Sequence, residues 1–168
     1  MQLSMYVPRA AAAPLEAVRQ VLDPVQHRLI PAHVTLCRED ELRGLRREDL
    51  ALRASGFLAQ SVELRFGPPV SFDGHGILLP CVSGELEFRE LREHVLGTTH
   101  VRRQAPHITL AHPRNPKAPG NDLATARTLP PDLAFRFTSV TLIRQEGGGP
   151  WQVLDELRLA GLVARREK

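Results

Sequence analysis

The sequence predicts an α+β fold, in which residues 1–168 form one domain of two αβ lobes that face each other across a central cleft. A short motif occurs twice, as His33-Val34-Thr35-Leu36 and as His107-Ile108-Thr109-Leu110. Each half of the chain also shows strand and helix patterns in the same order, ending in paired strands, which suggests a pseudo-twofold relation between the lobes. At this length, folding can bury most of the apolar surface without disulfides.

The first half should begin with a strand over residues 3–7, followed by a helix with Pro14 near its first turn. Asp23-Pro24 should end that helix, because the residue before a proline is pushed out of the α region, and a strand should come next. Over residues 32–37, alternation places histidine and threonine on one face and two aliphatic residues on the other. A second helix is expected over residues 47–59, with four candidate buried residues: Leu50, Ala54, Phe57 and Leu58.

The middle and last parts of the chain continue the alternation of strands and helices. Residues 62–66 and 77–82 resemble a strand pair, and a helix over 85–96 should lie between a cap at Ser83 or Gly84 and a stop at Gly97. The second motif lies in residues 105–111. A proline-rich loop over 114–121 and a short helix over 123–129 should follow. Residues 133–144 and 152–159 then predict two antiparallel strands around a glycine-rich turn.

Composition and charge narrow the class of protein. The formal charge of +3 permits an anionic partner, but acidic residues alternate with arginines, so the charge gives little support for nucleic-acid binding. Cys37 and Cys81 favour two reduced thiols over a disulfide between them. The sequence has neither a signal-peptide pattern nor an apolar run of about 20 residues that could span a bilayer. We therefore expect a cytoplasmic monomer with no membrane partner.

The repeated motif supplies the groups that phosphodiester cleavage requires. A histidine two residues before a threonine on a strand presents an imidazole and a hydroxyl on the same side, about 7 Å apart along the chain. Because histidine titrates near neutrality, one ring can activate water as a base while the other protonates the leaving oxygen. The hydroxyls of Thr35 and Thr109 can donate to non-bridging phosphate oxygens without a metal. His33 and His107 are the candidate catalytic pair.

Cationic side chains near the two motifs are candidate third ligands of the phosphate. Arg38 lies five residues after His33, and Arg114 and Lys117 follow the second motif. A guanidinium matches phosphate geometry, although Arg38 is equally well explained as a solvent-facing charge. Cys37 is interpreted as a small packed residue rather than a nucleophile.

Several other residues with possible chemistry are better explained by structure. Four further histidines lack the spacing of zinc ligands and are expected at the surface: His27, His75, His94 and His100. The aromatic residues that could stack a base are more readily explained as core or lobe-packing residues: Tyr6, Phe72 and Trp151.

The doubled motif resembles the signature of the two-histidine (2H) phosphoesterase superfamily, specifically its 2′-5′ RNA ligase-like and RNA 2′,3′-cyclic phosphodiesterase branch. The resemblance extends over nearly the whole chain in length, element order and the 74-residue interval between His33 and His107. It implies two mainly antiparallel sheets flanking a central cleft, with helices outside, no cofactor and no required metal. It assigns the acid and base roles to the two histidines, and it makes the two threonines ligands of the phosphate. His107 is the favoured base, although the roles depend on the direction of substrate entry.

The chain departs from the family pattern at one position. Many relatives have arginine five residues after the second motif histidine, whereas this chain has His112. The phosphate contacts and the substrate therefore stay open at this point.

Three functions are consistent with these residues. The leading one is hydrolysis of a 2′,3′-cyclic phosphate at RNA or nucleotide ends, together with the reversible 2′-5′ ligation that some family members perform. The first alternative is a 2H enzyme that acts on a small non-RNA phosphodiester, such as ADP-ribose 1″,2″-cyclic phosphate, or on oligoadenylate. The second alternative is a non-catalytic module that binds RNA ends. An intact acid–base pair favours the two enzymes, with RNA ends or cyclic nucleotides as partners.

Overall fold

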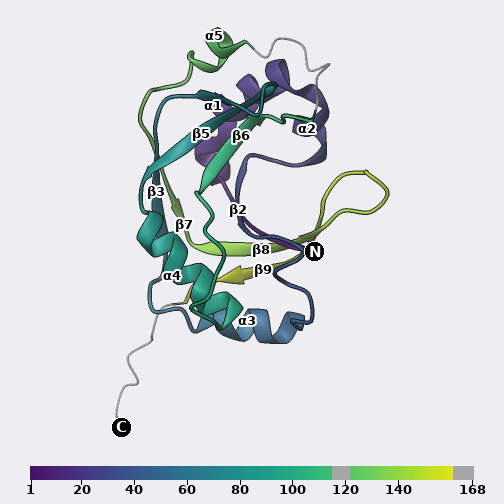
Figure 1. The fold of residues 1–168 in the computed structure, drawn as a ribbon, viewed down its shortest axis with the longest axis vertical. Helices are drawn as coiled ribbons and strands as arrows, with labels where there is room; N and C mark the ends of the chain where they lie inside the picture. The colour runs from purple at the N-terminus through teal and green to yellow at the C-terminus, as the bar shows by residue number, and fades with distance from the viewer. Residues whose placement is uncertain (115–121, 161–168) are drawn as a thin grey trace.

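The computed structural model describes residues 1–114 and 122–160, which form an α+β fold dominated by antiparallel strands (Figure 1). The strands are β1 (Gln2–Tyr6), β2 (His33–Cys37), β3 (Val62–Phe66), β4 (Val70–Phe72), β5 (Gly76–Ser83), β6 (His107–Ala111), β7 (Leu133–Phe137), β8 (Ser139–Arg144) and β9 (Gln152–Arg158). The helices are α1 (Arg9–Leu22), α2 (Pro24–Leu29), α3 (Arg47–Ser55), α4 (Glu85–Leu96) and α5 (Leu123–Ala126). No helix within the described residues is long and apolar enough to cross a membrane.

Hydrogen bonds connect the strands in the order β7-β3-β5-β6-β2-β1-β8-β9, and β4 pairs with β5. Each of these pairings is antiparallel. The order is symmetric about the β6–β2 pair, with three further strands on either side. The predicted α+β class is confirmed, and the two expected sheets are the halves of one hydrogen-bonded sheet. The grouping of the whole chain into one two-lobed domain stays a prediction.

The sheet is strongly curled, and the expected single strand over residues 133–144 is wrong for this reason. Only Thr138 separates β7 from β8. Yet β7 pairs with β3 at one end of the strand order, whereas β8 pairs with β1 and β9 near the other end. Two Cα steps cover less than about 8 Å, so the two ends of the sheet must approach each other. Figure 1 shows the chain passing directly from β7 into β8.

The segment between α1 and β2 also differs from the expectation. Asp23 ends α1 as predicted, but α2 begins at Pro24, where only a strand was expected. Proline is well tolerated at the first position of a helix, because the N–H that it lacks has no helical partner there. The Asp23 carboxylate accepts a hydrogen bond from the Gln26 N–H at 3.1 Å, so it caps the new helix. Pro14 lies inside α1 rather than near its start, because the helix already begins at Arg9.

Three smaller differences concern helix and strand ends. The helix expected over 47–59 stops at Ser55, so Leu58 lies beyond it and is 68% exposed, whereas the other three candidate residues are buried. Strand β4 was not expected and pairs with β5 across the Asp73-Gly74-His75 turn. The expected helix over 123–129 is shorter, because α5 ends at Ala126. By contrast, α4 has the predicted bounds, and Cys37 and Cys81 are both buried and unpaired.

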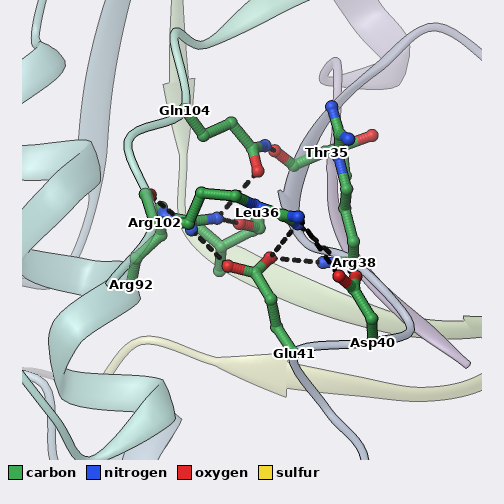
Figure 2. Close-up of polar contacts among 8 residues, drawn as sticks. All are labelled: Thr35, Leu36, Arg38, Asp40, Glu41, Arg92, Arg102 and Gln104. Atoms are coloured by element: carbon green, nitrogen blue, oxygen red, sulfur yellow. Dashed lines mark hydrogen bonds and ion pairs between the residues drawn. The ribbon is translucent and has the colours of Figure 1, made fainter. Parts of the chain in front are cut away.

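The two central strands share only one residue pair, Val34 with Ile108. Beyond it, the carbonyl oxygens of β2 accept hydrogen bonds from side chains. Gln104 Nε2 donates to the Thr35 oxygen at 2.6 Å, and Arg92 Nη1 donates to the Leu36 oxygen (Figure 2). Leu36 is the extra residue of a β-bulge against β1, which leaves its carbonyl without a regular strand partner.

The Arg92 guanidinium, from α4, connects several segments behind the motif strands. The side chain of Arg92 is 1% exposed. It also donates to Gln104 Oε1 at 3.0 Å, to the Arg102 carbonyl at 3.1 Å and to Glu41 Oε1 at 2.6 Å (Figure 2). The end of β2, the loop after it and the segment that leads into β6 are therefore held by one buried cation. Such a cation is tolerated in the interior because its donors are satisfied.

We expect Arg92→Met to lower the free energy of unfolding by about 2–4 kcal/mol, because it leaves a carboxylate and two carbonyls without their buried donor. Urea titration followed by circular dichroism measures this loss. The matched control is Arg89→Met on the same helix. Arg89 is exposed and, among the described residues, pairs with Glu93 alone, so its replacement should change the free energy by less than about 0.5 kcal/mol. Equal effects of the two substitutions would contradict the role of Arg92.

Candidate active site

The register of β2 against β6 brings the four motif side chains together. Val34 pairs with Ile108, and both side chains are buried in the core on one face of the sheet. In an antiparallel pair the flanking residues also lie opposite each other, so His33 faces Thr109, and Thr35 faces His107, on the other face. Ordinary sheet spacing then places the two histidines on a diagonal, about 7–8 Å apart. Buried and partly exposed residues follow each other in the same order in the two strands.

All four of these side chains line one cavity of about 920 Å³. Arg38, Arg114 and His112 line it as well, so every described residue that the sequence singled out for phosphate contact reaches this cavity. Lys117 lies outside the described residues. In Figure 2 the Arg38 side chain extends from the end of β2 toward Thr35.

Backbone carbonyls determine the tautomer of both motif histidines. His33 Nδ1 lies 2.8 Å from the Pro31 oxygen, and His107 Nδ1 lies 3.0 Å from the Ala105 oxygen. A carbonyl oxygen only accepts, so Nδ1 carries the proton and donates it in both rings. In the neutral form Nε2 then has the lone pair. Each ring therefore offers Nε2 as its atom for proton transfer, through the same contact two residues upstream.

The two imidazoles have similar aromatic neighbours. The Tyr6 ring lies edge-on to His33, with ring centroids 6.1 Å apart, and the Phe72 ring lies 6.4 Å from that of His107. Burial lowers the pKa of His33 to about 4, and the charges of Arg19 and His107 act in the same direction. The hydrogen bond to Pro31 and the charge of Glu16 oppose this shift. His33 is therefore neutral over the physiological pH range.

A partly buried ion pair on α1, which the sequence analysis missed, supports His33. Arg19 is 3% exposed, and its Nη1 lies 2.6 Å from Glu16 Oε2. Arg19 also donates to the Ile30 oxygen at 2.8 Å, and the second Glu16 oxygen accepts the Ala32 N–H at 2.6 Å. The pair thus holds the backbone on both sides of Pro31. A charged residue among the core-facing positions of an amphipathic helix was the available signal.

Two glutamines that the sequence analysis also missed contact Thr35. Gln2 Nε2 lies 3.2 Å from Thr35 Oγ1 and 2.8 Å from Ser4 Oγ, whereas Gln104 binds the Thr35 carbonyl. Both glutamines line the cavity. Thr35 lies 33 residues from Gln2 and 69 residues from Gln104 in the chain, so no local pattern reveals these contacts.

The remaining candidates are placed as follows. Burial raises the pKa of the Cys37 thiol to about 12, so this residue is not a nucleophile at neutral pH. His94 is not at the surface as expected, because it packs against Phe57 with its Nε2 buried. Trp151 lines the cavity. Among the described residues, no group of three or more histidine, cysteine, aspartate or glutamate side chains is arranged to hold a metal ion.

Comparison with known proteins identifies the family. The model of the 2′-5′ RNA ligase superfamily matches residues 7–149. LigT of Escherichia coli complexed with 3′-AMP has a TM-score of 0.60 and 19% identity, over 94% of this chain and 96% of that chain. LigT complexed with ATP has a TM-score of 0.59 and 17% identity, over 94% and 96%. A structure described as a phosphoesterase has a TM-score of 0.54 and 15% identity, also over 94% and 96%.

At these identities the solved structures show the fold alone, and comparison with curated proteins gave no significant match. The family match, however, covers most of the chain. It agrees with the resemblance to two-histidine phosphoesterases that the doubled motif indicated. The chain therefore belongs to the 2′-5′ RNA ligase superfamily.

Proposed function

We propose that this protein is a metal-independent phosphodiesterase that opens a 2′,3′-cyclic phosphate, or cleaves a related phosphodiester, at RNA or nucleotide ends. One observation carries the proposal: two imidazoles with the same backbone-determined tautomer and two hydroxyls line a single cavity. The relative LigT has been solved with 3′-AMP and with ATP, which supports a nucleotide ligand for a cavity in this fold.

His33 serves as the general base and His107 as the general acid. The lowered pKa of His33 keeps its Nε2 unprotonated at neutral pH, as a base requires. His107 then takes the role of the acid, because its ring lines the same cavity as His33 and the reaction needs one group for each proton transfer. This assignment reverses the preference for His107 as base that came from the sequence. The geometry of the two rings is otherwise the same, so their surroundings decide the roles.

In the forward reaction, His33 Nε2 removes a proton from water as the water oxygen bonds to phosphorus. The bond from phosphorus to one ribose oxygen breaks, and His107 Nε2–H protonates that oxygen. Negative charge increases on the non-bridging oxygens, where the hydroxyls of Thr35 and Thr109 donate hydrogen bonds. Arg38 and Arg114 add positive charge on the cavity wall. With a 5′-hydroxyl in place of water, the same groups would support reversible 2′-5′ ligation.

Replacing either histidine should remove catalysis but preserve the fold. We expect His33→Ala and His107→Ala each to lower kcat for nucleoside 2′,3′-cyclic phosphates by about 10²–10⁴-fold, the usual contribution of a positioned acid or base. Ring opening is followed by chromatography of the products in buffer containing EDTA. The control is His75→Ala, because His75 is exposed in the β4–β5 turn and does not line the cavity.

The same assay separates the proposed function from its alternatives. Undiminished turnover by the double variant of His33 and His107 would refute the acid–base assignment. Turnover that EDTA abolishes would refute metal independence. A preference for small cyclic phosphates over RNA with a cyclic-phosphate end would favour a non-RNA substrate. RNA-end binding without turnover of any substrate would favour a binding module.

The pH dependence of kcat/KM reports the assigned base. Since the neutral form of His33 is required and its pKa lies near 4, activity should stay high as the pH falls below 6 and should decline only near pH 4. An unperturbed histidine would cause that decline near about pH 6.5. Circular dichroism at each pH verifies that the protein is folded. An acidic limb with its midpoint at or above about 6.5 would be evidence against His33 as the base.

A further inference from the structure

A third imidazole lines the cavity and has no part in the proposed proton transfers. His112 directly follows β6, and its main-chain N–H donates to Asp23 Oδ2 at 2.9 Å. Asp23 is fully buried where α1 meets α2. The first residue after the motif strand is therefore anchored to a buried carboxylate, while its side chain lines the same cavity as His33 and His107.

The tautomer of His112 is opposite to that of the two motif histidines. The Arg114 main-chain N–H donates to His112 Nδ1 at 3.1 Å. A backbone N–H only donates, so Nδ1 accepts and the neutral ring carries its proton on Nε2. Protonation of Nδ1 would place two donors against each other, which favours the neutral ring. Burial and then the Arg114 charge lower the pKa of His112, whereas Asp23 raises it.

His112 follows the last residue of β6, so it lies past the motif histidine and threonine of that strand. Thr109 faces His33, and His112 lies three residues farther along the chain, beyond the end of β6. Near His112 the cavity wall includes Gln26, Ile30 and Trp151, together with the cationic side chain of Arg114. Beyond Thr35, at the other end of β2, the wall includes the charged side chains of Arg38, Asp40 and Arg43. If the motif side chains hold the phosphate, the aromatic, aliphatic and amide side chains of Trp151, Ile30 and Gln26 suit the nucleoside attached to it.

We propose that His112 determines specificity by donating a hydrogen bond from its Nε2–H to an acceptor atom of the substrate nucleoside. The inference rests on the proposed function, because it places the phosphate between the motif residues. His112 can donate but cannot serve as a base, since Nδ1 is occupied and Nε2 holds the proton. It therefore cannot replace His33 or His107 in the proton transfers.

Two substitutions of His112 test the proposed Nε2–H donor separately from the contact between Nδ1 and the Arg114 N–H. In His112→Asn the side-chain oxygen can still accept the Arg114 N–H, but no donor reaches the place of Nε2. In His112→Gln the longer side chain can bring an amide N–H to that place. His75→Gln is the matched surface control. The substrates are a nucleoside 2′,3′-cyclic monophosphate, methyl riboside 2′,3′-cyclic phosphate and glycerol 1,2-cyclic phosphate, which has no nucleoside.

We expect His112→Asn to lower kcat/KM for the nucleoside substrate by about three- to tenfold, the effect of one neutral hydrogen bond, and to leave glycerol cyclic phosphate unchanged. His112→Gln should retain most of the activity. A loss that persists with the riboside locates the acceptor on the ribose, and a loss confined to the nucleoside locates it on the base. Equal losses on all three substrates, or no loss for His112→Asn, would overturn the inference.

Binding provides a readout that does not depend on turnover. By isothermal titration calorimetry, His112→Asn should weaken the affinity for 3′-AMP by a similar factor and leave the affinity for inorganic phosphate unchanged. Absence of turnover in the unmodified protein would count against the proposed function, while this comparison would still test the contact. Unchanged 3′-AMP affinity would refute the contact itself.

Discussion

A single backbone pairing, Val34 with Ile108, positions the whole candidate site, because it is where the two halves of the sheet meet. Side chains alternate along a strand, so a slip of one residue in either strand would turn the histidine and the threonine of that strand into the core. One pairing is a small contact, and side chains reinforce it. Arg92 and Gln104 bind the carbonyls of β2 and the segment that enters β6, so the register does not depend on strand hydrogen bonds alone.

Chemically identical side chains acquire different roles through the backbone groups beside them. Carbonyls two residues upstream hold the proton of His33 and His107 on Nδ1, whereas a main-chain N–H holds that of His112 on Nε2. Burial and nearby positive charge then lower the pKa of His33. A symmetric motif can therefore support an asymmetric reaction, because its two copies lie in unequal surroundings.

The motif residues were predictable because the repeat places them twice at the same spacing, and alternation assigns them a face. Helix α4 was predictable because glycines bracket it and its apolar residues recur with helical spacing. The supporting residues were not. Arg19, Gln104 and Arg92 act through partners that lie 11, 69 and 56 residues away. Such contacts leave no local pattern, apart from a charged residue in the core-facing stripe of a helix.

The sequence by itself identified the candidate catalytic and phosphate-binding groups, since residue type and strand alternation follow from local geometry. It also indicated the α+β class and the order of most elements. Tertiary structure decided that residues 133–144 divide between distant parts of the sheet, because the break at Thr138 depends on how the sheet curls. It also decided which ring nitrogen carries each proton and which imidazole stays neutral. Those properties arise from carbonyls, amides and charges that only folding brings within reach.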